Sequence, residues 1–167
     1  MLGWLQPLNA QVSKEYQIKA VFLWRLAQFV EWPTNAFASA QAPITIGVLG
    51  DNPFGEALDL AVRDETAHGR KLVVRQSDRI EDIRSCHLLY ISRSEARRAS
   101  AVTSALAGKP VLTVSDVDGF ADLPNGMIQF VTVQSRVTFR INLEAAKAAG
   151  LVLDARLLRM AEVIKSQ

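Results

Sequence analysis

Polar side chains able to bind a ligand follow three apolar runs of the sequence. They are Asp51, Asn52, Ser92 and Asp116. If those runs are parallel strands, their carboxyl ends meet at one edge of a sheet, where open α/β sheets bind ligands. A crevice for a small ligand is therefore one interpretation. The other is structural: Asn52 and Ser92 act as helix caps, and Asp51 and Asp116 form turns. We favour the structural interpretation because it explains each residue on its own.

No common catalytic motif accompanies these residues. Gly47, Gly50 and Gly55 have the wrong spacing for the dinucleotide-binding Gly-x-Gly-x-x-Gly motif, and no Gly-Lys-Ser/Thr follows them. There is no Gly-x-Ser-x-Gly elbow of a hydrolase. Ser92 and Ser115 stand where a phosphate-accepting receiver domain needs an aspartate. The sequence therefore predicts a non-enzymatic protein without a cofactor.

The sulfur and imidazole side chains are also too few for a metal centre. Cys86 is the only cysteine, so an intramolecular disulfide is impossible, and the only histidines are His68 and His87. A structural zinc site normally needs four such ligands. We expect Cys86 to be a buried apolar residue, His87 a hydrogen-bonded structural residue, and His68 a helix-end residue next to Gly69.

The clearest indication of binding lies in residues 13–31, which predict a helix capped by Ser13 and stopped by Pro33. At about 100° per residue, one broad apolar face comprises Tyr16, Ala20, Leu23, Leu26, Ala27 and Val30. A second apolar sector comprises Ile18, Phe22 and Phe29. A surface helix usually has one apolar stripe, so this helix is either buried on two sides or contacts another chain. We predict a partner or dimer interface at Val21, Trp24, Gln28, Phe29 and Trp32.

The rest of the chain alternates strands and helices. We predict strands at 44–49, 71–75, 87–91, 111–114, 127–133 and 137–141, and helices at 53–67, 78–84, 92–106, after Asn142, and 154–164. A Ser92-x-x-Glu95 capping box starts the helix at 92. The pattern predicts an α/β fold: a doubly wound, mostly parallel sheet flanked by helices, with a C-terminal β-hairpin at the sheet edge.

Composition indicates one folded domain, residues 13–167. The chain has 167 residues, of which 49% are hydrophobic, and a net charge of +2. The densest basic cluster, Arg93, Arg97 and Arg98, lacks interleaved aromatics, so we expect no nucleic-acid partner. No apolar run is long enough to span a membrane. Residues 1–12 are apolar and include the small residue Ala10. They are either the remnant of a signal peptide or a cytoplasmic N-terminus.

The motifs of the chain resemble, in order, those of YfiR-like proteins. The matching segments are Tyr16-Gln-Ile-Lys-Ala-Val-Phe-Leu, Phe29-Val-Glu-Trp-Pro33, Ile46-Gly-Val-Leu-Gly-Asp-Asn-Pro-Phe-Gly55, Gly69-Arg70, Cys86-His-Leu-Leu-Tyr-Ile-Ser-Arg-Ser-Glu95, Val111-Leu-Thr-Val-Ser-Asp116, Gly119-Phe-Ala121, Gly126-Met-Ile, Phe139-Arg-Ile-Asn-Leu-Glu-Ala-Ala146 and Gly150-Leu151. Each motif alone is weak, but the ordered set is specific.

The resemblance implies a periplasmic, homodimeric regulator, exported by a signal peptide, that represses a membrane-bound diguanylate cyclase or a similar sensor. Cyclic-di-GMP signalling and biofilm formation would then fall. Better-known relatives use disulfides, whereas Cys86 leaves only an intermolecular one open here. The alternative function is a periplasmic sensor domain that binds a small ligand at Asp51, Asn52, Ser92 and Asp116.

Overall fold

The computed structural model describes residues 12–164, which fold around a mixed sheet of eight strands. Residues 1–11 of the expected signal-peptide remnant (1–12) lie outside the described residues, as do residues 165–167. The strands are β2 (Ile44–Leu49), β3 (Thr66–Ala67), β4 (Arg70–Ser77), β5 (Leu88–Ile91), β6 (Leu112–Ser115), β7 (Ile128–Val133), β8 (Arg136–Asn142) and β10 (Ala161–Ile164). Their order across the sheet is β10-β8-β7-β6-β5-β2-β4-β3.

The centre of this sheet is parallel and doubly wound. Neighbouring strands run parallel from β4 through β2, β5 and β6 to β7. In chain order these strands read 2-1-3-4-5, which is one of the common doubly wound arrangements. Strands β7 and β8 form the antiparallel hairpin, and β10 pairs in parallel with β8 at the sheet edge. The predicted α/β fold class is therefore confirmed, but the hairpin does not form the sheet edge as predicted, because β10 pairs with its outer strand.

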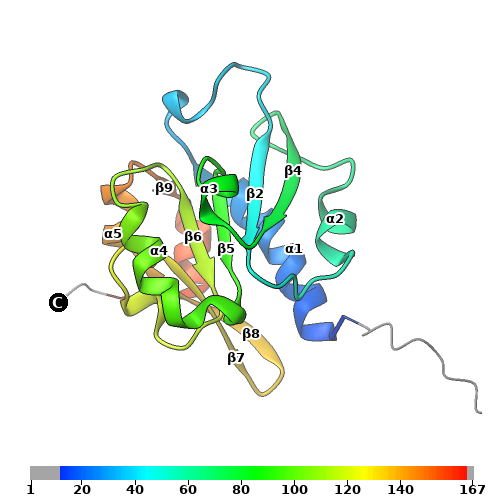
Figure 1. Ribbon diagram of the computed structural model, residues 1–167, viewed down its shortest axis with the longest axis vertical. Helices are drawn as coiled ribbons and strands as arrows, with labels where there is room; N and C mark the ends of the chain where they lie inside the picture. Colours follow the sequence, from blue (N-terminus) through cyan, green and yellow to red (C-terminus); the bar gives the residue numbers. More distant parts are fainter. Residues whose placement is uncertain (1–11, 165–167) are drawn as a thin grey trace, which may run out of the picture.

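Helices cover both faces of the sheet. They are α1 (Lys14–Phe29), α2 (Ala57–Val62), α3 (Ile80–Ile83), α4 (Ala99–Ala105), α5 (Leu143–Ala148) and α6 (Ala155–Arg159), with 3-10 turns η1 (Thr34–Ala36), η2 (Arg93–Arg98) and η3 (Phe120–Asp122). In Figure 1, α1 lies behind the sheet and α4 in front of it. Side chains of β5 alternate accordingly: Leu88 and Tyr90 join the core cluster that includes α1, whereas Leu89 and Ile91 join the one that includes α4. Within residues 12–164, no helix has both the length and the apolar character needed to cross a membrane.

Helix α1 begins where the sequence predicts and ends earlier. The Ser13 hydroxyl accepts a hydrogen bond from the Tyr16 amide, as expected of an N-cap. The helix stops at Phe29 instead of residue 31, because Val30 and Glu31 form a strand, β1 (Val30–Glu31), that pairs with β9 (Val152–Leu153). Pairing with a segment distant in the sequence overrides the local helical pattern.

The predicted helix at 53–67 is largely wrong. Only Ala57–Val62 is helical, and Thr66–Ala67 forms β3 against β4. Asn52 does not cap the helix. Its side chain accepts a hydrogen bond from the Phe54 amide at 2.9 Å, which makes a local turn ahead of α2. Asp64 has a left-handed backbone (φ 60°), so the helix cannot continue past it.

The predicted final helix, 154–164, is correct only in its first half. Asp154 caps α6 as expected, by accepting from the Arg156 amide at 2.8 Å. The chain then changes to β10, whose register places Val163 beside Ile141. An open strand edge on β8 stabilises the extended form of a sequence that contains two β-branched residues, Val163 and Ile164.

The predicted capping box at Ser92 is also absent. The Ser92 side chain makes no cap hydrogen bond, and the segment after it is η2 before it becomes α4. Glu95 does not reach back to the Ser92 amide, because its carboxylate pairs with Arg98 instead. The Ser92 amide donates to the Leu49 carbonyl at 3.0 Å, which joins the ends of β2 and β5.

Gly126, just before β7, provides a test of this packing. A Cβ at this position would lie 2.0 Å from the carbonyl oxygen of Phe120, a backbone atom that cannot move away cheaply. We expect Gly126→Ala to lower the free energy of unfolding by about 3 kcal/mol, as overpacked sites do. Gly108→Ala is the control, because that position is open but left-handed (φ +77°), and it should cost only about 1–2 kcal/mol. If urea denaturation shows equal losses of unfolding free energy for the two variants, Gly126 is not packed as closely against the Phe120 carbonyl as described.

Candidate functional site

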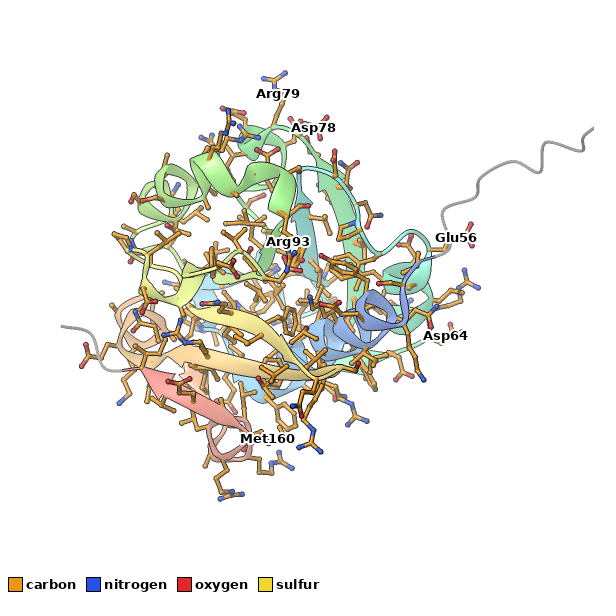
Figure 2. All side chains as sticks on the ribbon, turned by 90° about the horizontal axis from the view of Figure 1, so that it is seen from below. Glu56, Asp64, Asp78, Arg79, Arg93 and Met160 are labelled. Atoms are coloured by element: carbon orange, nitrogen blue, oxygen red, sulfur yellow. The ribbon has the colours of Figure 1, made fainter. Side chains whose placement is uncertain are left out.

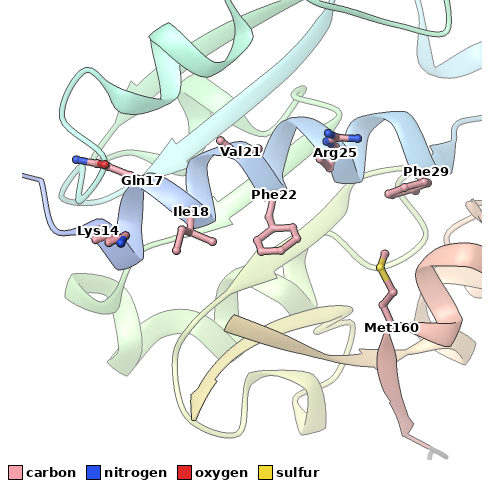
Figure 3. Close-up of a pocket in the computed structure, with 8 residues that line it drawn as sticks. All are labelled: Lys14, Gln17, Ile18, Val21, Phe22, Arg25, Phe29 and Met160. Atoms are coloured by element: carbon pink, nitrogen blue, oxygen red, sulfur yellow. The ribbon is translucent and has the colours of Figure 1, made fainter. Parts of the chain in front are cut away.

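An open apolar groove runs along the exposed side of α1. Its lining includes Ile18, Val21, Phe22 and Phe29 from the helix, and Met160 from the turn between α6 and β10. The cavity volume is about 580 Å³. Figure 3 shows Met160 extending toward Phe29 across the groove. Val21 and Met160 remain 44% and 52% exposed, so the groove is a surface on which apolar side chains meet water.

The floor of the groove is anchored in the core. Phe22 packs edge-on against Phe139, with ring centroids 4.9 Å apart, and lies 6.4 Å from Phe130. On the opposite side of α1, Ala20, Leu23, Leu26 and Ala27 are buried, as the main apolar face of the helix predicts. The second apolar sector of α1 is thus the part that lines the groove, with Ile18, Phe22 and Phe29 half-buried.

The predicted interface residues occupy three different environments. Val21 and Phe29 line the groove. Trp24 and Gln28 are half-buried beside it, and Trp24 carries the Arg25 guanidinium 5.1 Å from its ring centroid. Trp32, in contrast, is buried in the core, where its indole N–H donates to the His87 carbonyl at 2.9 Å.

Sequence reasoning did not select the remaining groove residues as interface positions. The sequence pattern could have indicated Ile18 and Phe22, because they form the second apolar sector of the helix. No sequence pattern indicates Met160, since only the fold brings it to α1. The basic residues Lys14 and Arg25, which also line the groove, are ordinary helix-surface residues in the sequence.

A buried ion pair fixes α1 to the strand ends. The Lys19 ammonium lies 2.9 Å from a carboxylate oxygen of Asp116, just after β6, and both side chains are only 1% exposed. Lys19 also contacts Glu15 at 2.6 Å, and Tyr16 donates its hydroxyl hydrogen to Asp116 at 2.6 Å. A buried charge is tolerated only when it is paired and hydrogen-bonded, and this cluster meets that condition.

Arg93 completes the cluster from the solvent side. Its Nε lies 3.3 Å from the other carboxylate oxygen of Asp116, although its own side chain is 63% exposed. Figure 2 shows that Arg93 and Met160 lie well apart, so the charged cluster and the groove open at different places. The cluster therefore positions α1 and does not line the groove.

The electrostatics of the cluster follow from its geometry. Burial disfavours the ionised form of Asp116, but the hydrogen bonds from Lys19 and Tyr16 outweigh it and hold the pKa of this carboxyl below its usual value of 3.8. Burial, with the neighbouring Asp116 carboxylate, raises the pKa of Tyr16 to about 12. The same causes raise the pKa of Tyr90, whose hydroxyl is buried next to Asp116.

The four residues proposed to form a ligand crevice do not share a network. Asp51 and Asn52 are exposed turn residues, and Ser92 is buried. Within residues 12–164, no hydrogen bond or ion pair joins any of these three to Asp116. Gly50 has a left-handed backbone, and a Cβ there would lie 2.4 Å from the Ser94 hydroxyl. The protein's own loops are therefore in close contact where β2 and β5 end.

The histidines and the cysteine lie in the environments of structural residues. The Nδ1 atom of His87 accepts from the Thr45 amide at 3.0 Å, so its Nε2 must donate to the Ala36 carbonyl. Burial lowers the pKa of His87, which favours this neutral form. Cys86 is buried, and burial raises its pKa to about 12.

His68 is exposed after β3, not at a helix end, and it contacts the Val30 carbonyl. The part of the chain that the structure describes contains no cluster of three or more metal-ligating side chains.

Asp116→Asn tests the buried pair. The variant removes the buried counter-charge of Lys19 and leaves only the partly exposed Glu15 carboxylate beside it, so we expect the free energy of unfolding near pH 7 to fall by about 3 kcal/mol. In the wild type the folded-state pKa of Asp116 lies below 3.8, so its carboxylate stabilises the fold above that pH and this contribution is lost as the pH falls further. As the pH falls below about 4, the free energy of unfolding measured by urea denaturation should therefore decrease less in the variant than in the wild type.

Asp59→Asn is the matched control, because Asp59 is exposed on α2. It should change stability by no more than about 0.5 kcal/mol. Parallel pH profiles for wild type and Asp116→Asn would contradict the assigned role of the carboxylate.

A comparison with protein families finds a match over most of the chain. A family model described as YfiR/HmsC-like matches residues 16–162, which cover α1 from Tyr16 onward and the large sheet as far as the first two residues of β10. The search of curated proteins returns no significant match. The matched range contains the buried ion pair and all of the groove residues except Lys14. On this coverage, the chain belongs to the YfiR/HmsC-like family.

Proposed function

We propose that this protein is a non-enzymatic periplasmic regulator that binds the extracytoplasmic region of a membrane-bound diguanylate cyclase, or of a similar sensor, and represses it. Cyclic-di-GMP signalling and biofilm formation then fall. Family membership supports this class of function. The observation that carries the binding role is the groove along α1, because a surface that leaves Val21 and Met160 half-exposed to water is typical of an interaction site.

The mechanism is a population shift. A regulator that binds the inactive state of a sensor more tightly than the active state moves the sensor toward inactivity, without any chemistry of its own. The regulator needs a surface that is already formed before the sensor arrives. Helix α1 fits this role, because Phe22 packs on the aromatic core and Lys19 is ion-paired at the strand ends.

Met160→Asp tests sensor binding. The substitution places a charge in the groove at an exposed position, so the fold should tolerate it while the apolar contact is lost. We expect binding to the purified extracytoplasmic region of the cyclase encoded nearest to this gene to weaken by about tenfold or more, as measured by calorimetry. In cells that lack the gene, the wild type should lower cyclic-di-GMP and Met160→Asp should not.

Val133→Asp is the matched control, since Val133 is 57% exposed at the end of β7 and does not line the groove. It should bind and signal like the wild type. If both variants repress the cyclase fully, the groove is not the binding site.

Self-association forms part of the same proposal. Trp24 and Gln28 are spaced i and i+4, so they share one side of α1 next to the groove, and a second copy would contact this side. We expect light scattering to give a dimer mass for the wild type and a monomer mass for Gln28→Asp. Leu60→Asp, at an exposed position of α2, should remain dimeric. A monomeric wild type at all concentrations would refute the dimer.

A further inference from the structure

The groove along α1 has a rim of one charge sign. Lys14 and Arg25 line it, and no acidic residue does. Neither of the two forms an ion pair within residues 12–164. The nearest acid on the helix, Glu15, points away, because its carboxylate binds Lys19 and the Thr132 hydroxyl. The rim therefore carries positive charge that the described part of the chain does not neutralise.

The neighbouring strand does not supply the missing negative charge either. Glu162 of β10 is paired in register with Arg140, whereas Val163 is paired with Ile141. Since successive side chains of a strand point to opposite faces, Glu162 lies on the sheet face away from α1, where its carboxylate is 3.7 Å from Arg140. Val163 points to the α1 face and is 43% exposed, so this strand presents an apolar side chain and not an acidic one on that face.

The groove is elongated along α1. It follows α1 from Lys14 to Phe29, roughly 22 Å at 1.5 Å per residue. Its apolar lining residues Ile18, Val21 and Phe22 are spaced i, i+3 and i+4, so they lie on neighbouring turns of α1; in Figure 3, Ile18 and Phe22 point to the same side of the helix. The apolar part of the lining, from Ile18 to Phe29, is roughly 16 Å long and matches the apolar face of a helix of about 11 residues or more, the usual ligand of such grooves.

We propose that the groove binds an amphipathic helix of the sensor whose apolar face is flanked by Asp and Glu residues. This inference rests on the proposed function and specifies the chemistry of its partner. The apolar face of such a helix covers Val21 and Met160, and its acidic residues pair with Lys14 and Arg25. Complementary charge of this kind speeds association and selects the correct partner.

Other occupants fit the groove less well. A second copy in a two-fold contact brings the same basic rim toward itself, and like charges across an interface oppose binding. An anionic membrane complements the charge but not the shape, because the groove is hollow between α1 and Met160 and a bilayer surface is flat. An acidic helix complements both.

A charge-exchange experiment tests the proposal. Two helical peptides of about 15 residues share an apolar face and carry either Glu or Lys at the flanking positions. Binding to the full chain is measured by fluorescence anisotropy for the wild type and for the double variant Lys14→Glu/Arg25→Glu. We expect the wild type to bind the Glu peptide about tenfold more tightly than the Lys peptide, and the double variant to reverse this order. The double variant Arg63→Glu/Lys71→Glu, at exposed positions outside the groove, should behave like the wild type.

Each result decides the inference. Equal affinity of the wild type for both peptides overturns it. It is also overturned if the wild type binds phosphatidylglycerol vesicles and neither peptide, which would make the groove a membrane site, or if Met160→Asp abolishes a wild-type dimer, which would make the groove a self-contact.

Sensor binding separates this inference from the proposed function. If Met160→Asp loses the cyclase region and Lys14→Glu/Arg25→Glu retains it, the groove binds the sensor through apolar contacts alone, so the proposed function holds and the inference fails. If the wild type does not bind any cyclase region but the peptides show the reversal, the proposed function fails, and only the preference of the groove for an acidic amphipathic helix of another protein holds.

Discussion

The ion pair between Lys19 and Asp116 is the interaction on which the rest of the surface depends. Removing two charges from water costs several kcal/mol each, and the pair recovers this only with good geometry and extra hydrogen bonds. Tyr16 and Glu15 supply those bonds. Because few placements of α1 satisfy these conditions, the ion pair fixes both the rotation of the helix and its position along the strand ends. Every groove residue except Met160 lies on α1 and is positioned with it.

The groove forms because the sheet extends further than the helix α1 that packs on it. The sheet extends past the hairpin to β10, whereas α1 packs over Phe130 and Phe139 of that hairpin. On the face of β10 toward α1, Ala161 packs against the core, whereas Val163 beyond it remains exposed and forms a short apolar strip. In a soluble protein such a strip is normally either covered by further chain or used for binding. Met160, which lines the groove along α1, directly precedes β10 in the chain.

Local sequence predicts the fold better than it predicts this surface. Long periodic segments such as β2 and the start of α1 have patterns that packing does not override, so the α/β class and the Ser13 cap are confirmed. Short segments depend on their neighbours: residues 161–164 continue a helical pattern but become β10 because β8 has a free edge. Tryptophan is a residue type that is common in interfaces, yet Trp32 lies in the core, where its side chain donates a hydrogen bond to the carbonyl of His87, a residue distant in the sequence. The sequence alone likewise gives no reason to expect a buried Lys19, because its partner Asp116 follows β6 and only the fold brings the two together.

A groove that is rigid in the free protein places the switching in its partner. Under the proposed function, the regulator acts only through the difference between its affinities for two sensor states. Changing a ratio of 1:99 to 99:1 requires about a 10⁴-fold difference. A sensor helix that exposes its apolar face in one state and buries it in the other provides a difference of this size, since several buried apolar side chains at about 1.5–3 kcal/mol each are gained or lost together. The fixed position of α1 then means that little of this energy is spent on ordering the regulator.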